Sequence, residues 1–246
     1  MTTDRDRAAR TPSLDRCNRR QLLRFAGSTA ALAMAPELYA QDAAAGSTLC
    51  VVKPEQTEGP YFVDNKLLRG DIRSDPADSA LKPGATLQLT LRLSAVNASL
   101  CSPLAGAIVD LWHNDARGEY SDVRDRRYDN RGKQFLRGYQ ITDGSGVVNF
   151  TTIYPGWYPG RTVHIHFKVR TDPAERRGFE FTSQLYFDDA LTDEVHLMAP
   201  YANNGKRDTR NDDDRIFRRG GRDLMLHLRR EGDLFAGTFE LGLELG

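Results

Sequence analysis

The sequence has no excess of either charge, few cysteines and no apolar run long enough to span a membrane. Its 246 residues hold 34 lysines and arginines against 34 aspartates and glutamates, so the formal net charge is zero. A neutral chain has no overall field that would draw it onto nucleic acid, so no nucleic-acid partner is expected. Its apolar fraction of 39%, with 21 glycines and 11 prolines, predicts one globular domain with a sizeable core.

The N-terminal segment has the charge and apolar pattern of an export signal. Residues 1–24 carry seven arginines against three aspartates, which is an excess of four positive charges. An apolar stretch from Phe25 to Ala35 follows, and it is too short to form a stable membrane span. The Arg19–Arg20 pair and the small residues near Ala40 resemble a twin-arginine signal.

These features predict an export signal over residues 1–45 and a mature domain over residues 46–246, located in the periplasm. The alternative is a cytosolic chain with a disordered basic tail. Export would remove Cys17 and leave Cys50 and Cys101 as an even pair in an oxidising compartment. A disulfide between them is then plausible, and two buried free thiols are the alternative, because spacing alone does not show how close the two residues come.

The mature chain is rich in residues that alternate between apolar and polar, which is the pattern of strands with one buried face. No stretch has a sustained helical period, and the loops at 121–134 and 199–221 are long and charged. We therefore predict an all-β fold, a β-sandwich of antiparallel strands with long functional loops. The predicted strands cover residues 87–95, 107–112, 139–141 and 147–153 (as a hairpin), 163–169, 179–187, 224–228 and 239–245.

The sharpest local feature is a pair of histidines, His164 and His166, in one predicted strand. In a strand both imidazoles point to the same face, so both could bind one ion. Alone the pair does not separate metal ligands from two ordinary strand histidines. Two tyrosine-bearing loops, residues 115–121 and 154–161, lie before this strand in the sequence.

With these loops the sequence resembles the intradiol ring-cleaving dioxygenases, a nonheme iron(III) family that includes the protocatechuate and catechol enzymes. The resemblance is to the protocatechuate branch, since no helical region precedes its first block. It runs through five blocks in family order: Thr57–Phe62, Val109–Ser121, Arg137–Gln140, Tyr158–Phe167 and Ser183–Phe187.

The resemblance implies that Tyr120, Tyr158, His164 and His166 bind the metal. Two phenolates are hard anionic donors, which favour iron(III) over iron(II) and suit neither structural zinc nor magnesium. It further implies that a catecholic substrate and O2 bind there, and that the ring is cleaved between its two hydroxyl-bearing carbons to a cis,cis-muconate-type diacid. Tyr158 would act as a base for one substrate proton.

The resemblance also implies roles for residues around the metal. Arg161 would lie beside the substrate ring and stabilise negative charge, and Gln184 would hydrogen-bond near the metal-bound oxygens. Gly59, Tyr61 and Trp157 would line the substrate pocket. The alternatives are a surface arginine, an outward strand glutamine and core aromatic residues.

Other features are interpreted as structural. His113, His196 and His227 have no assigned role in the resemblance, and the acidic run 211–214 is taken as a solvated loop. The main alternative function is a metal-free periplasmic β-sandwich binding module for aromatic ligands. A hydrolase is not favoured, because no serine-centred or paired-carboxylate arrangement is visible. A homo-oligomer or hetero-oligomer is possible in this family.

Overall fold

The computed structural model describes residues 51–97, 100–171 and 178–245. The predicted export signal, residues 1–45, and Cys50 lie outside these residues, so both remain predictions. Cys101 is disulfide-bonded, and its partner also lies outside the described residues.

One sheet is organised around a long strand, β1, which pairs along both of its edges. On one edge it pairs with β9, which in turn pairs with β8; on the other edge its first part pairs with β5 and its last part with β2. These strands are β1 (Thr86–Asn97), β2 (Leu100–Pro103), β5 (Val147–Ile153), β8 (Leu228–Glu231) and β9 (Leu234–Glu244).

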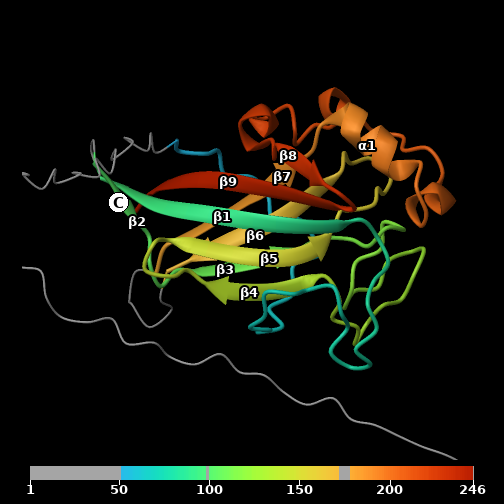
Figure 1. The fold of residues 1–246 in the computed structure, drawn as a ribbon, viewed down its shortest axis with the longest axis horizontal. Helices are drawn as coiled ribbons and strands as arrows, with labels where there is room; N and C mark the ends of the chain where they lie inside the picture. Colours follow the sequence, from blue (N-terminus) through green and yellow to red (C-terminus); the bar gives the residue numbers. More distant parts are fainter. Residues whose placement is uncertain (1–50, 98–99, 172–177, 246) are drawn as a thin grey trace, which may run out of the picture. The chain divides into compact units, whose positions relative to one another are not determined.

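The second sheet is antiparallel throughout and has the order β4-β3-β6-β7. Its strands are β3 (Ile108–Trp112), β4 (Arg137–Ile141), β6 (His164–Arg170) and β7 (Glu180–Tyr186). The two sheets form two layers (Figure 1), which confirms the predicted all-β sandwich.

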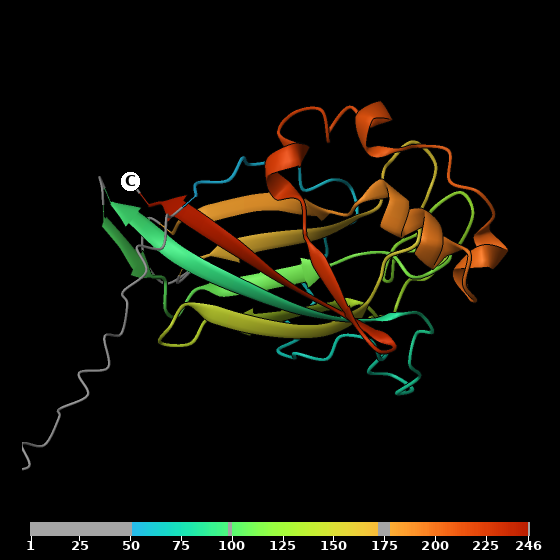
Figure 2. The same ribbon diagram turned by 45° about the horizontal axis from the view of Figure 1, so that its top comes forward.

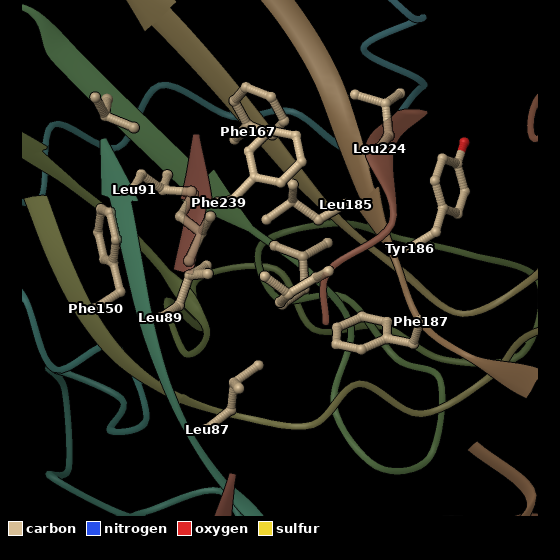
Figure 3. Close-up of a cluster of buried hydrophobic side chains, with 14 of the residues drawn as sticks. Leu87, Leu89, Leu91, Phe150, Phe167, Leu185, Tyr186, Phe187, Leu224 and Phe239 are labelled. Atoms are coloured by element: carbon tan, nitrogen blue, oxygen red, sulfur yellow. The ribbon is translucent and has the colours of Figure 1, made fainter. Parts of the chain in front are cut away.

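The core lies between the two sheets because alternate residues of each strand face inward. Leu89 and Leu91 of β1 point toward Phe167 of β6 and Leu185 of β7 (Figure 3), and all four side chains are buried. Burying one such side chain stabilises the fold by about 1.5–3 kcal/mol. The opposite face of β6 carries His164 and His166, so the same alternation that builds the core also presents the histidines together.

The prediction that all strands are antiparallel is wrong for one pair, since β1 and β9 are parallel over residues 86–96 and 234–244. A parallel pair needs a long crossover connection. Here the connection contains the whole second sheet, so β9 can approach β1 in either direction, and the local sequence pattern does not encode which direction is used.

The predicted hairpin of residues 139–141 and 147–153 is also wrong. The chain does reverse, because Asp143 Oδ1 accepts hydrogen bonds from the backbone N–H groups of Ser145 (2.8 Å) and Val147 (2.9 Å). However, β4 pairs with β3 in one sheet and β5 pairs with β1 in the other. Turn residues specify a reversal, whereas the packing of each strand into the core decides which sheet it joins.

Helical segments occur in the C-terminal region, where none was predicted. They are α1 (Asp189–His196) and three short 3-10 turns at Tyr201–Asn204, Asn211–Asp213 and Gly221–Leu224. The side chain of Asp188 caps α1 by accepting from the N–H groups of Ala190 and Leu191. Two helical turns are too few to give a visible period. Of the predicted strand over 224–228, Leu224 ends a 3-10 turn, Met225 forms an isolated bridge with Tyr186, and only Leu228 lies in a strand, β8.

The long loops and α1 gather at one end of the strands, opposite β2 (Figures 1 and 2). The β3–β4 loop, the β5–β6 loop and the segment after β7 all reach this end, as predicted for loops that carry function. Within the described ranges, no helix is long and apolar enough to cross a membrane.

Candidate metal centre

The two histidines of β6 meet at the loop-covered end of the second sheet. Their Nε2 atoms are 3.1 Å apart and their ring centroids 4.7 Å apart. His164 Nδ1 lies 2.6 Å from the carbonyl oxygen of Thr162, which can only accept, so Nδ1 carries the proton. His164 Nε2 is therefore left with a lone pair that is free to bind a metal.

Burial keeps both imidazoles neutral. Desolvation lowers the pKa of His164 and of His166 well below the usual 6.5, and the guanidinium of Arg161 lowers both further. The His166 ring stacks on Trp112, with ring centroids 4.9 Å apart and planes within 7°. The stacking fixes the orientation of a ring whose Nδ1 has no hydrogen-bond partner in the described residues.

Two tyrosines from two loops complete the cluster. Tyr158, in the β5–β6 loop, places its hydroxyl oxygen 3.3 Å from His164 Nε2. Tyr120, in the β3–β4 loop, has its ring centroid 5.8 Å from that of Tyr158 and 6.3 Å from that of His166. Its hydroxyl is fully buried and makes no well-formed hydrogen bond to any described residue.

The two loops are fastened to each other. Asp115 Oδ1 accepts from the N–H groups of Arg117 and Glu119, which closes a turn just before Tyr120. Gly118 in this turn has φ +79°, and a Cβ there would lie 2.1 Å from the carbonyl oxygen of Trp157. Only glycine allows this approach, so the turn before Tyr120 lies directly against the residue before Tyr158.

The cluster has the chemistry of a metal site. Burial raises the pKa of Tyr120 and of Tyr158 above the usual 10, so neither phenol ionises unless a cation supplies compensating charge. A buried hydroxyl without a partner costs about 1–3 kcal/mol, which a bound ion would offset. Two phenol oxygens and two imidazole nitrogens therefore fit a hard trivalent metal, held by Tyr120, Tyr158, His164 and His166.

Elsewhere the described segments contain no cluster of three or more histidine, cysteine, aspartate or glutamate side chains that could hold a metal ion. The acidic run 211–214 in particular forms no such cluster. A site at the loop-covered end therefore depends on the tyrosines as well as the histidines.

Arg161 lies against the histidines and is held from two sides. Its Nη1 is 3.5 Å from His164 Nε2, its Nη2 donates to Gln184 Oε1 (2.6 Å), and its Nε donates to Asp214 Oδ2 (2.8 Å). The surface-arginine alternative is therefore not what the structure shows. Gln184 is fully buried, and its Nε2 donates to the carbonyl of Thr57 (2.8 Å), so both ends of its amide are engaged. In this structure Gln184 contacts Arg161 and positions it.

Asp214 is a site residue that the sequence analysis missed, because the run 211–214 was taken as solvated. Asp212 and Asp213 are exposed, but Asp214 is only 1% exposed. Its two oxygens accept from Arg161 Nε and from the backbone N–H groups of Thr162, Ile216 and Phe217. No sequence signal separates Asp214 from its acidic neighbours except the apolar pair Ile216–Phe217 that follows it.

The three predicted pocket residues lie beside the cluster. The Tyr61 ring stacks on Tyr120, with centroids 4.5 Å apart, and its hydroxyl donates to Asp125 Oδ2 (3.0 Å). A Cβ on Gly59 would lie 3.5 Å from Cε1 of His166, so the backbone passes close to that ring. Trp157 is half-buried next to Tyr158, and its indole N–H donates to the Gly205 carbonyl (3.1 Å).

Ionic contacts fix the segment that carries Gly59 and Tyr61. Lys168, two residues beyond His166 on the same face of β6, forms ion pairs with Glu58 and Glu180. Its ammonium also lies 4.4 Å from the centroid of the Phe62 ring. The segment is thus tied to β6 on both sides of Tyr61.

The remaining histidines have structural surroundings, as expected. His113 is buried, with Nδ1 2.7 Å from the Asn114 carbonyl and Nε2 2.6 Å from Thr152 Oγ1. Burial lowers its pKa to about 4. His196 Nε2 contacts the Pro155 carbonyl at 3.1 Å, and His227 is exposed.

The fold and site together define a β-sandwich protein with a candidate metal centre of two tyrosines and two histidines. A family model described as a dioxygenase matches residues 57–212, which is more than half of the chain. The chain belongs to the intradiol ring-cleavage dioxygenase family.

Individual relatives agree with this placement. A chlorocatechol 1,2-dioxygenase of Pseudomonas putida is 30% identical over 151 residues, covering 53% of this chain and 52% of that protein. A solved intradiol ring-cleavage dioxygenase from Tetranychus urticae is 30% identical with a TM-score of 0.68, covering 80% of this chain and 96% of that one. The dioxygenase domain of a dioxygenase carbohydrate-binding protein fusion from Streptomyces sp. SirexAA-E is 28% identical with a TM-score of 0.56, covering 80% and 100%. The chain spans about half the length of the curated relatives that it matches.

Proposed function

We propose that this protein is a nonheme iron(III) intradiol dioxygenase. It would cleave a catecholic ring with O2 between the two hydroxyl-bearing carbons and release a cis,cis-muconate-type diacid that contains both oxygen atoms. The observation that carries the proposal is the buried cluster of Tyr120, Tyr158, His164 and His166, whose phenol and imidazole groups converge. The printed names of relatives, catechol and chlorocatechol 1,2-dioxygenases, support a catechol as the substrate class.

Bound iron(III) would supply the Lewis acidity that lets the phenols and the catechol ionise in a buried site. The protein's own groups then have distinct tasks. Burial raises the pKa of Tyr158, so its phenolate is a strong proton acceptor, suited to take one catechol proton at Oη. Arg161, fixed by Asp214 and Gln184, places a guanidinium where negative charge develops on the ring.

The aromatic residues orient the ring and exclude water. Tyr61 lies flat against Tyr120 and edge-on to Tyr158, with ring centroids 4.5 Å and 6.2 Å apart. A flat substrate ring can pack against such faces, and the low dielectric strengthens the interaction with Arg161.

The binding-module alternative is less consistent with these observations. A module that binds aromatic ligands without metal has no need for a buried hydroxyl without a partner, such as that of Tyr120, beside two converging imidazoles. Such a group lowers stability unless a metal compensates.

The test is a visible absorption spectrum of the iron-loaded protein, recorded before and after catechol is added without oxygen. Tyrosinate bound to iron(III) absorbs strongly, so we expect a visible band that shifts with catechol and is lost in Tyr120→Phe and Tyr158→Phe. Tyr201→Phe is the matched control, since Tyr201 is equally buried but donates to the Tyr154 carbonyl away from the cluster. A protein that binds zinc alone, or no metal, would refute the iron site.

We also propose export of the mature domain to the periplasm by the twin-arginine route. The supporting features are the Arg19–Arg20 pair and the apolar stretch after it. Cell fractionation tests this, with Arg19→Lys/Arg20→Lys as the variant. We expect the wild type in the periplasm and the variant in the cytosol, and identical distributions would contradict the assignment.

A further inference from the structure

A cavity of about 460 Å³ lies beside Arg161. Its lining includes Arg161, Ile216, Arg215 and Arg219. Because Arg161 Nη1 is also 3.5 Å from His164 Nε2, the cavity and the candidate metal centre share Arg161 as a wall. Its volume is within the range of pockets that bind small molecules.

Some of the charged groups around the cavity already bind other residues, and others do not. Three guanidinium groups, of Arg161, Arg215 and Arg219, face two carboxylates, of Asp213 and Asp214. Asp214 is buried, and its oxygens already accept four hydrogen bonds, one of them from Arg161. Asp213 is exposed and is the one remaining acid in this lining.

Arg215 and Arg219 differ from most other arginines of this region in having no acidic partner. Arg207, Arg210 and Arg222 form ion pairs with neighbouring aspartates. By contrast, no carboxylate or carbonyl in the described part of the chain accepts a hydrogen bond from the guanidinium of Arg215 or Arg219, and both residues are exposed. Their donors remain available to a ligand.

The backbone that carries these two arginines is fixed rather than loose. Gln56 Nε2 donates to the carbonyls of Ile216 (3.1 Å) and Arg219 (3.2 Å). At the start of the segment, Asp214 Oδ1 accepts from the Ile216 N–H (2.6 Å), and the side chain of Phe217 is buried in the core. A ligand in the cavity would meet an apolar surface from Ile216 and two guanidinium groups presented from a fixed segment.

We propose that Arg215 and Arg219 form a carboxylate-binding subsite next to the proposed catechol site, an inference that rests on the proposed function. A planar guanidinium donates two parallel hydrogen bonds to a carboxylate, which a neutral catechol cannot accept in the same way. The carboxylate has two sources: a carboxyl substituent on the substrate ring, or the diacid product, whose two carboxylates are created by the reaction itself.

The experiment compares Arg215→Gln and Arg219→Gln with Arg218→Gln, an exposed arginine of the same segment that does not line the cavity. Binding of 3,4-dihydroxybenzoate, of catechol and of cis,cis-muconate is measured by titration calorimetry on the metal-free protein. The first two are also titrated anaerobically into the iron-loaded protein.

We expect each cavity variant to weaken binding of a carboxylate probe about tenfold and to leave catechol binding within about twofold. Arg218→Gln should leave all three affinities unchanged, and added salt should weaken the carboxylate probes in the wild type. Loss confined to 3,4-dihydroxybenzoate identifies a substrate carboxylate, and loss confined to muconate identifies the product. Either result supports the subsite.

The subsite is refuted if both cavity variants bind both carboxylate probes as tightly as the wild type, or if catechol binding weakens by the same factor. The proposed subsite and the proposed dioxygenase function can be refuted independently of each other. Carboxylate binding that depends on Arg215 and Arg219 in a protein without an iron–tyrosinate band would keep the subsite and overturn the dioxygenase assignment. Conversely, a protein that cleaves catechol but whose carboxylate binding does not depend on Arg215 and Arg219 would support the dioxygenase assignment and overturn the subsite.

Discussion

The most informative single change is Asp214→Asn, because one carboxylate organises both Arg161 and the segment that follows it. The Asp214 side chain is 1% exposed and that of Arg161 16% exposed. The carboxylate oxygens of Asp214 accept hydrogen bonds from Arg161 Nε at 2.8 Å and from the backbone N–H groups of Thr162, Ile216 and Phe217 at 2.9, 2.6 and 3.2 Å. Asparagine has nearly the same shape, so the substitution removes charge and one acceptor without leaving a cavity.

The expected loss of stability follows from burial. Removing one partner of a buried ion pair leaves the other charge uncompensated and costs about 3–5 kcal/mol. The amide nitrogen of asparagine would also face a donor, either Arg161 Nε or the backbone N–H groups of the following turn. For a domain of this size each kcal/mol lowers Tm by about 2–4 °C, so we expect a drop of about 6–20 °C.

The assay is thermal and urea unfolding of the metal-free protein, followed by circular dichroism. Asp212→Asn is the matched control, because Asp212 is two residues away and its ion pair with Arg222 is largely exposed. We expect the control to change stability by less than about 0.5 kcal/mol. If Asp214→Asn and Asp212→Asn both unfold within about 1 °C of the wild type, the central role of the Asp214 carboxylate is refuted.

Three further predictions concern other parts of the site. Tyr120→Phe should stabilise the metal-free protein by about 1 kcal/mol, since it removes a buried hydroxyl without a partner, and should abolish iron binding, measured by unfolding and metal analysis. Gly118→Ala should lower the free energy of unfolding by at least about 2 kcal/mol and weaken iron binding, because the new Cβ would lie 2.1 Å from the Trp157 carbonyl oxygen at a position where φ is +79°. His113 has a native pKa of about 4, below the usual value of about 6.5 in the unfolded chain, so the unfolded state binds more protons between these pH values. This residue should therefore remove up to about 3 kcal/mol of stability as the pH falls from 6.5 to 4, and His113→Asn should flatten the pH profile of urea unfolding.

Each of these has a control of the same chemistry. Tyr154→Phe removes a buried hydroxyl that bonds Thr192 at 2.7 Å, so it should destabilise the protein where Tyr120→Phe stabilises it. Gly160 has φ +82° but no atom within 4 Å of an added Cβ, so Gly160→Ala should cost only the backbone strain, about 1–2 kcal/mol. His227→Asn, at an exposed position, should keep the wild-type pH profile. Equal effects of a variant and its control would contradict the corresponding explanation.

The fold was predictable as far as the strands have a local signature. Leu87 to Leu93 and Ile165 to Val169 alternate over several residues, and both are strands with alternate side chains in the core. The sequence did not predict which strands pair with each other, or whether a pair is parallel or antiparallel. The turn at Asp143 predicts a reversal equally well for a hairpin and for a crossing between sheets, and the direction of β9 depends on the path of more than 130 residues that precede it.

The cluster was predictable only in part for a similar reason. The spacing of His164 and His166 places them on one face, but Tyr120 and Tyr158 come from loops, and nothing local to either loop brings them to the histidines. The resemblance to a family supplied that link. Asp214 was missed because burial, rather than residue type, distinguishes it from Asp212 and Asp213, and burial there depends on the packing of Phe217 in the core.

The parallel pairing of β1 and β9 has a consequence for the order in which the molecule folds. β9 lies between β1 and β8, so β1 can pair only along the edge that it shares with β5 and β2 until residues 234–244 are available. The histidine-bearing sheet, by contrast, has all four of its strands once residue 186 is made. Pairing of two strands so far apart in the sequence is slow. Until β9 pairs with β1, the exposed edge of β1 can pair with strands of other chains. We expect C-terminal deletions that remove β9 to aggregate rather than to yield a smaller folded protein.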